Sequence, residues 1–226
     1  MMNGADIKTK PLLNLWQIFT IGLIMLVYSF LPSCQSTGSG DSSTRTRVIF
    51  DTDIGGDIDD ALALAMLYNY MDMGWIEMLA VMSCKDNPYS PRYIDLMNHW
   101  YGYPDLPIGI VVDGVKHDTS AYARIVVEMK KDGVSIFPRS PGEGQDLPIA
   151  VSLYRKLLSE SPDSSVVIIA VGQSTNLARL LDSEPDEYSP LPGRELVSLK
   201  VDYLSMMAGN FREHRAETNI FLDSVS

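Results

Sequence analysis

The stretch that decides the fold spans residues 48–62 and reads VIFDTDIGGDIDDAL. Val48–Phe50 is a short apolar run typical of a buried strand, and the paired glycines that follow allow a tight turn close to a ligand. Good helix formers resume at Ala61, so a helix is expected to begin near Ile58. The stretch therefore predicts a strand, a turn and a helix, with five aspartates packed around the turn.

These five aspartates are Asp51, Asp53, Asp57, Asp59 and Asp60. Asp57 is a candidate helix cap, and the last two would lie in the first helical turn, where the helix dipole favours negative charge. Unit charges about 4 Å apart repel by roughly 4 kcal/mol at an effective dielectric near 20, so several ionised aspartates in one pocket need protons or a cation. Oxygen ligands suit Ca²⁺ or Mg²⁺ and argue against zinc. The alternative is that they are solvated turn and cap residues.

Composition limits the partners that this chain can have. Its 226 residues, 46% of them hydrophobic, suffice for one sizeable core. The formal net charge of −11 argues against a nucleic-acid or anionic-membrane surface, because both require clustered Lys and Arg. Small neutral or cationic ligands remain open, and no nucleic acid is expected to bind.

The N-terminal segment is expected to direct the chain out of the cytoplasm. Residues 1–33 contain a mostly apolar run, Leu12–Leu31, followed by Cys34, and this resembles a bacterial lipoprotein signal peptide. Cys34 would then be lipidated and attach the protein to the cell envelope, facing the periplasm or the exterior. A plain secretory signal and a transmembrane anchor are the alternatives. Residues 34–47 are rich in Ser, Thr and Gly and are expected to form a flexible tether before a domain at 48–226.

Short apolar strands and longer helices alternate through this domain. Further strands are expected at 77–83, 107–112, 165–171 and 199–207. Helices are expected at 61–74, 90–102, 121–131, 148–160 and 175–181, and long loops at 132–147 and 182–198. Such alternation predicts the α/β class, with a mostly parallel, Rossmann-like sheet covered by helices on both faces. Ligands of such sheets bind at the carboxyl ends of the strands, where the aspartates lie.

Two later stretches add polar residues after predicted strands. Residues 166–178 read VVIIAVGQSTNLA, and residues 206–220 include MMAGNF and AETNI. By themselves, Thr175 and Asn176 could be a helix cap, and Met206 and Met207 would be expected in the core.

Taken in order with DTDIG and DIDDA, these stretches resemble the inosine-uridine preferring nucleoside hydrolases over most of residues 48–223. The resemblance implies a nucleoside hydrolase fold and hydrolysis of the N-glycosidic bond of ribonucleosides to ribose and free base by a Ca²⁺-activated water. It also implies a homodimer or homotetramer. Family members continue well beyond the AETN segment, so the C-terminal part of the fold, with a further calcium-binding Asp, is expected to be missing from the domain at 48–226.

The resemblance also assigns roles to individual residues. It implies that Asp53 is the catalytic base and a calcium ligand, that Asp60 is a second ligand, and that Thr175 binds calcium through its backbone carbonyl. The residues expected to bind the sugar are Asp59, Asn87, Met207, Glu217 and Asn219.

The acid that protonates the leaving base is not evident. His99 lies within a predicted helix and is expected to be structural, whereas His117 and His214 lie in predicted loops. Cys84 is expected to be a small core residue.

Two other functions remain open from the residues. A haloacid-dehalogenase-like Mg²⁺ phosphohydrolase would use Asp51 as nucleophile and Asp53 as acid. A lipoprotein that binds nucleosides without turnover would keep the pocket but lack the missing C-terminal ligand.

Overall fold

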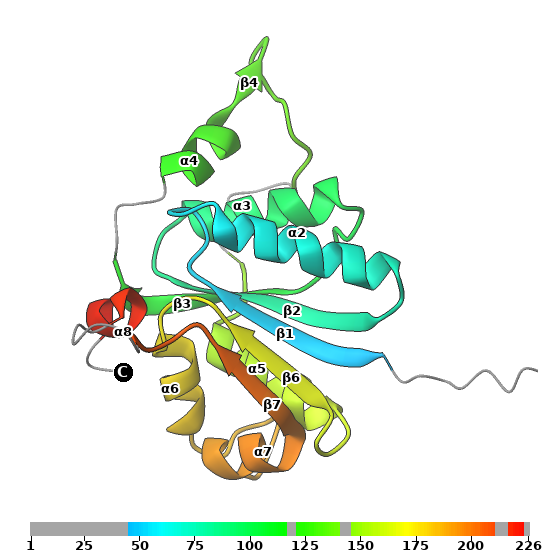
Figure 1. Cartoon of the computed structure of the whole chain (residues 1–226), viewed down its shortest axis with the longest axis vertical. Coiled ribbons are helices and arrows are strands. Elements are labelled where there is room, and N and C mark those ends of the chain that lie inside the picture. Colours follow the sequence, from blue (N-terminus) through cyan, green and yellow to red (C-terminus); the bar gives the residue numbers. More distant parts are fainter. Residues whose placement is uncertain (1–44, 117–120, 141–145, 211–216, 224–226) are drawn as a thin grey trace, which may run out of the picture. The chain divides into compact units, whose positions relative to one another are not determined.

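The computed structural model describes residues 45–116, 121–140, 146–210 and 217–223 (Figure 1). The predicted signal peptide, Cys34 and the tether up to residue 44 lie outside them, as do His117 and His214. Within the described ranges, no helix has the length and apolar character needed to span a membrane.

The centre of the domain is a five-stranded, fully parallel sheet in the order β3-β2-β1-β6-β7. Its strands are β1 (Thr46–Thr52), β2 (Ile76–Lys85), β3 (Ile108–Val115), β6 (Val166–Ala170) and β7 (Val201–Met206). The chain builds outward from β1 to β3 and then returns to pair β6 with the other side of β1. The strand order thus reverses between β1 and β6, and the predicted parallel sheet is confirmed.

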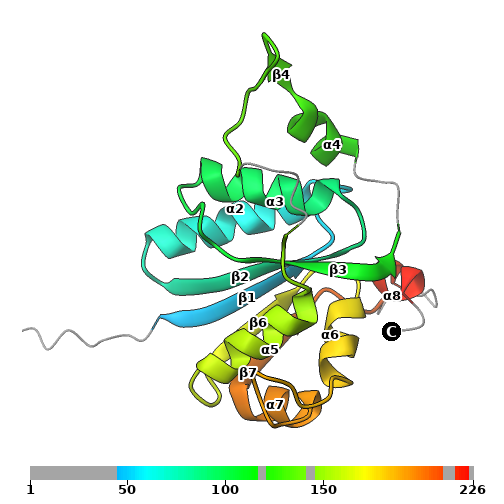
Figure 2. The same ribbon diagram turned by 180° about the vertical axis from the view of Figure 1, so that it is seen from behind.

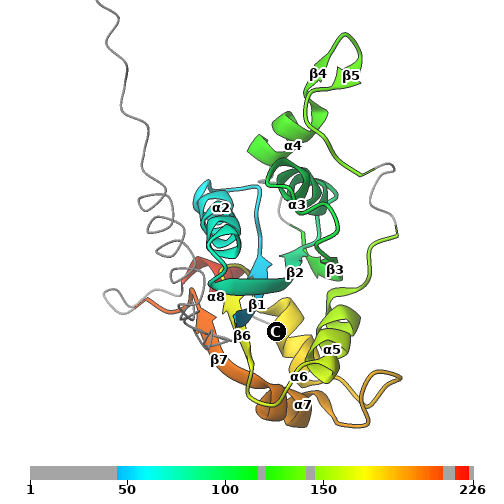
Figure 3. The ribbon, with the colours of Figure 1, turned by 90° about the vertical axis from the view of Figure 1, so that its right-hand side faces the viewer.

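Helices cover both faces of this sheet, as predicted (Figure 3). One face carries α2 (Asp59–Asp72) and α3 (Tyr89–Trp100), and α4 (Ala121–Glu128) packs on α3. The other face carries α5 (Ala150–Glu160), α6 (Thr175–Leu181) and α7 (Gly193–Lys200). The short helix α8 (Thr218–Leu222) lies beside α6 and the end of β3 (Figures 1 and 2).

Side-chain alternation along β1 divides the core into two layers. Ile49 packs with Leu153 and Ile168 on the α5 side, whereas Phe50 packs with Leu64 on the α2 side. All of these side chains are buried. Since β1 is buried on both faces, its residues Val48–Thr52 have little freedom to move, and the aspartates at its end start from a fixed base.

The structure corrects two of the expected loops. The predicted loop 182–198 contains the first turns of α7, which begins directly after Pro192 and buries Leu196. A Cβ on Gly193 would lie 1.7 Å from the carbonyl oxygen of Leu180, so only glycine lets α7 pack against α6. The predicted loop 132–147 begins within a hairpin of β4 (Lys130–Lys131) and β5 (Val134–Ser135), so the preceding helix stops at Glu128. Both errors arose because Pro and Gly were read as loop signals.

A buried arginine fixes the segment between α6 and α7. The side chain of Arg155 on α5 is 2% exposed and lies 2.7 Å from Asp186 Oδ2 through its Nε. Its other nitrogens donate to Ser183 Oγ and to the carbonyl oxygens of Ser189 and Leu191 at 2.8–3.0 Å. These bonds hold an irregular segment that has few other ways to satisfy its buried carbonyls.

Replacing Arg155 with methionine should lower the free energy of unfolding by roughly 2–4 kcal/mol, because it leaves two carbonyls and a carboxylate without their donor. Urea denaturation measures the change. Lys156→Met is the matched control, because Lys156 is the exposed neighbour on the same helix, and it should change stability by less than about 0.5 kcal/mol. Equal effects of the two substitutions would contradict this role.

Candidate active site

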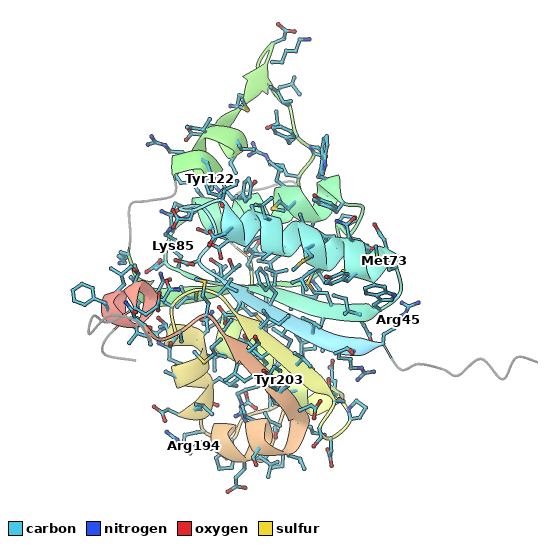
Figure 4. The ribbon with its side chains drawn as sticks, in the orientation of Figure 1. Arg45, Met73, Lys85, Tyr122, Arg194 and Tyr203 are labelled. Carbon is cyan, nitrogen blue, oxygen red and sulfur yellow. The ribbon has the colours of Figure 1, made fainter. Side chains whose placement is uncertain are left out.

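The candidate site lies at the carboxyl ends of β1, β2 and β6, where the strand order reverses. Open parallel sheets bind ligands at this kind of switch point. Figure 4 labels Lys85 at this edge of the sheet, while Arg45 marks the opposite edge.

Asp51 is part of the buried core rather than the open site. Its carboxylate is 1% exposed. It accepts a hydrogen bond from Tyr154 Oη at 2.9 Å and bonds from Asn176 Nδ2 at 3.2 and 3.3 Å. Burial raises the pKa of Asp51 to about 7, although these hydrogen bonds act in the opposite direction. A carboxylate so enclosed is not placed to attack a substrate, so the dehalogenase-like alternative loses its nucleophile.

Asp53 is the partly exposed carboxylate at the end of β1. Gln173 Nε2 donates a hydrogen bond to its Oδ2 at 2.7 Å, and Lys85 Nζ donates to its backbone oxygen at 3.4 Å. Burial raises the pKa of Asp53, and the Gln173 hydrogen bond and the Lys85 charge oppose that shift. Asp53 is therefore held in one orientation by a donor on the β6–α6 turn.

Asp60 lies beside Asp53 in the first turn of α2. Its Oδ1 accepts a hydrogen bond from Thr52 Oγ1 at 2.8 Å. Burial, followed by the negative charge of Asp53, raises the pKa of Asp60 to about 7. Asp59 is exposed on the same turn. Asp57 does not cap the helix as predicted, because Ile58 holds the N-cap position and no side chain caps it.

The chemistry of these donors fits a hard divalent cation. Asp53 and Asp60 supply carboxylate oxygens, and the negative charge of Asp53 raises the pKa of Asp60, as expected where negative charge is incompletely balanced. Asp53, Asp60 and the backbone carbonyl of Thr175 are the residues that would hold the ion. In the described part of the chain, no three acidic, His or Cys side chains converge closely enough to enclose an ion by themselves.

A second set of contacts ties α8 to this region. Thr175 Oγ1 donates to Asp223 Oδ2 at 2.7 Å, and Asn219 Nδ2 donates to the Val171 carbonyl at 3.1 Å. Glu217 caps α8 by accepting hydrogen bonds from the backbone amides of Asn219 and Ile220. The AETN segment, distant in sequence from the aspartates, is therefore anchored to the β6–α6 turn.

Comparison with known proteins explains this arrangement. The family model described as inosine-uridine preferring nucleoside hydrolase matches residues 48–226. The chain belongs to this nucleoside hydrolase family. Members are typically metal-dependent, and membership confirms the resemblance drawn from the three motifs.

Individual relatives agree with the assignment. The chain is 29% identical over 177 residues to the pyrimidine-specific ribonucleoside hydrolase RihA of Citrobacter koseri, an alignment covering 78% of this chain and 53% of RihA. Among solved structures, a plant nucleoside hydrolase, the PpNRh1 enzyme, is similar with a TM-score of 0.57 and 20% identity, covering 80% of this chain and 54% of that one. The type III effector XopQ, solved with adenosine diphosphate ribose, is also similar, with a TM-score of 0.57 and 18% identity. That match covers 80% of this chain and 50% of XopQ. The chain thus spans about half the length of the relatives it matches.

A cavity of about 550 Å³ adjoins the nucleoside hydrolase motifs. It lies between the end of β3, α6 and α8, and it shares Thr175 and Asp223 with the contacts described above. Its lining mixes both signs of charge: Asp113, Lys116, Arg179, Asp182 and Asp223.

Two other predicted sugar contacts, Asn87 and Met207, follow β2 and β7. Asn87 Oδ1 accepts the backbone amide of Tyr89 at the start of α3, which orients the loop after β2. Met207 is 46% exposed just beyond β7, and its amide donates to the carbonyl of Ala170. Their roles in sugar binding stay predictions. His99 bonds the carbonyl of Asp95 one turn earlier in α3, which agrees with the expected structural role.

Several residues of the site were not anticipated. Gln173 and Asn176 lie in the matched turn, but their contacts with Asp53 and Asp51 depend on the pairing of β1 with β6. Tyr154 comes from α5, about a hundred residues from Asp51, and no local pattern marks it. Lys85 ends β2 at this edge of the sheet, and its contact with Asp53 was not predicted.

Substituting Gly172 tests how tightly the site is assembled. A Cβ at this position would lie 2.6 Å from the backbone nitrogen of Asp53 and 2.5 Å from Cys84 Sγ. Gly172→Ala should therefore displace Asp53 and lower the free energy of unfolding by roughly 1–3 kcal/mol, as overpacking does. Urea denaturation measures this, with Ser174→Ala in the same turn as the control. Gly172→Ala stability equal to that of the control would contradict the close approach.

Proposed function

We propose that this chain carries the aspartate cluster of a ribonucleoside hydrolase site, which cleaves the N-glycosidic bond to give ribose and free base with Ca²⁺ as cofactor. The observation that carries the proposal is the pairing of Asp53 with Asp60 at the sheet's switch point, in a chain of the nucleoside hydrolase family. Burial raises the pKa of both carboxylates and so favours binding of a proton or a cation. A sugar with vicinal hydroxyls and a polar leaving group suits such a site.

The chemical problem is the departure of a poor leaving group from a sugar that develops oxocarbenium character. When bound, a divalent cation would lower the pKa of a water and help to orient the sugar hydroxyls. Asp53 would accept the proton of the attacking water. This role is supported by the hydrogen bond from Gln173, which fixes one carboxylate oxygen while the side chain stays partly open. Asp60, fixed by Thr52, would hold the ion beside it.

Sugar recognition would draw on both ends of the domain. Asp59 is exposed in the first turn of α2, within the electrostatic reach of Asp53 and Asp60. Asn219 is positioned by its bond to the Val171 carbonyl, at the end of the strand that pairs with β1. The family resemblance is what assigns Glu217 and Met207 to the sugar. RihA is described as pyrimidine-specific, so pyrimidine nucleosides are the first substrates to test.

The decisive variant is Asp53→Asn, which keeps the size of the side chain but removes the base. Ribose release from nucleosides in the presence of Ca²⁺ should fall at least about 100-fold, the lower end of what a general base contributes. Asp57→Asn is the matched control, because Asp57 is an exposed residue of the same turn, and its activity should stay close to that of the wild type.

Parallel assays separate the alternatives. Nucleoside binding without ribose release by the wild-type chain would support a binding lipoprotein instead of a hydrolase. Unchanged activity of Asp53→Asn would show that another group is the base. Phosphate release from monoesters would revive the phosphohydrolase reading, which the enclosure of Asp51 argues against.

A further inference from the structure

A lysine occupies the interior of the aspartate site. Lys85 is the last residue of β2, and its side chain is only 3% exposed. Lysines are almost never this buried unless a partner of opposite charge is close. Figure 4 shows Lys85 at the edge of the sheet where α2 begins. Its position needs an explanation that the family motifs do not provide.

The contacts of Lys85 point towards the two proposed metal ligands. Its Nζ donates to the backbone oxygen of Asp53 at 3.4 Å. The positive charge of Lys85 acts on both Asp53 and Asp60, and it opposes the effect of burial on each of them. The next lysine along the chain, Lys116, is 72% exposed and pairs instead with Asp86. Lys85 is therefore an ammonium group that the fold brings to the cluster.

The register of the sheet is what places it there. The pairing of β2 with β3 shifts between Ser83 and Lys85, so that Lys85 pairs with Val115 although Ser83 pairs with Ile110. A bulge of this kind redirects the side chains that follow it. The irregularity occurs at the one point of β2 that adjoins the end of β1.

We propose that Lys85 is an internal counter-ion that sets the affinity of the aspartate site for divalent cations. This inference rests on the proposed use of Asp53 and Asp60 as metal ligands. The ammonium group balances part of their charge before any ion arrives, and it repels an ion that binds between them. Cation binding must then overcome or displace the lysine, so the site binds divalent cations more weakly than the carboxylates alone would.

Calorimetric titration of the full chain with CaCl₂ and with MgCl₂ tests the proposal. Lys85→Gln should bind at least one of the two ions about tenfold or more tightly than the wild type, a change of about 1.4 kcal/mol. Lys85→Arg, which keeps the charge, should stay within about threefold of the wild type. Lys116→Gln removes the same charge from the nearby surface and should also stay within about threefold, because exposed charges are screened.

Each other outcome overturns the proposal. It fails if Lys85→Gln binds no tighter than the wild type, if Lys116→Gln tightens binding equally, or if no variant takes up either ion. Should Lys85→Gln not fold without metal, the proposal requires that added Ca²⁺ restore its circular dichroism spectrum, and absence of rescue refutes it. Ribose release measured on the same samples keeps the two questions apart. Tighter binding without hydrolysis would refute only the proposed function, and hydrolysis without any effect of Lys85 would refute only the counter-ion.

Discussion

Three neighbouring carboxylates, two at the end of β1 and one in the first turn of α2, are the constraint on which the rest of this structure depends. Asp51, Asp53 and Asp60 are all wholly or largely withdrawn from solvent, and burial raises the pKa of each. Charges in such surroundings repel strongly because little water screens them. The fold must supply hydrogen-bond donors, protons or cations at this point, because unbalanced charge would destabilise the packing around these carboxylates.

The parallel topology delivers those donors from distant segments. Because β6 returns to pair with β1, its turn brings Gln173 to Asp53 and Asn176 to Asp51. Helix α5, on the opposite face from α2, adds the hydroxyl of Tyr154. The two aspartates at the end of β1 thus have different surroundings: Asp51 is enclosed in the core by hydrogen bonds, and Asp53 stays partly exposed.

Much of this arrangement follows from sequence, and the exceptions have physical causes. The apolar run before Asp51 and the alternation of strands and helices predicted the parallel sheet, because both signals are local. Helix α7 was missed because its start depends on Gly193 fitting against α6. The partners of the aspartates were missed for a related reason. Tyr154 and Lys85 contact the aspartates only after distant strands and helices have packed together. Motif resemblance identified the Asp53 and Asp60 pair, but not what balances its charge.

The most direct measurement is the number of protons released when a divalent cation binds, obtained by calorimetry in buffers of different ionisation enthalpy. The pKa of Asp60 is raised to about 7 in the metal-free protein, so near pH 6.5 this carboxyl holds a proton for much of the time. An ion that takes its oxygen must expel that proton. The account predicts release on the order of one proton per ion at pH 6.5, falling towards zero above about pH 8. Uptake of an ion with no proton release at pH 6.5, or no uptake at all, would contradict it.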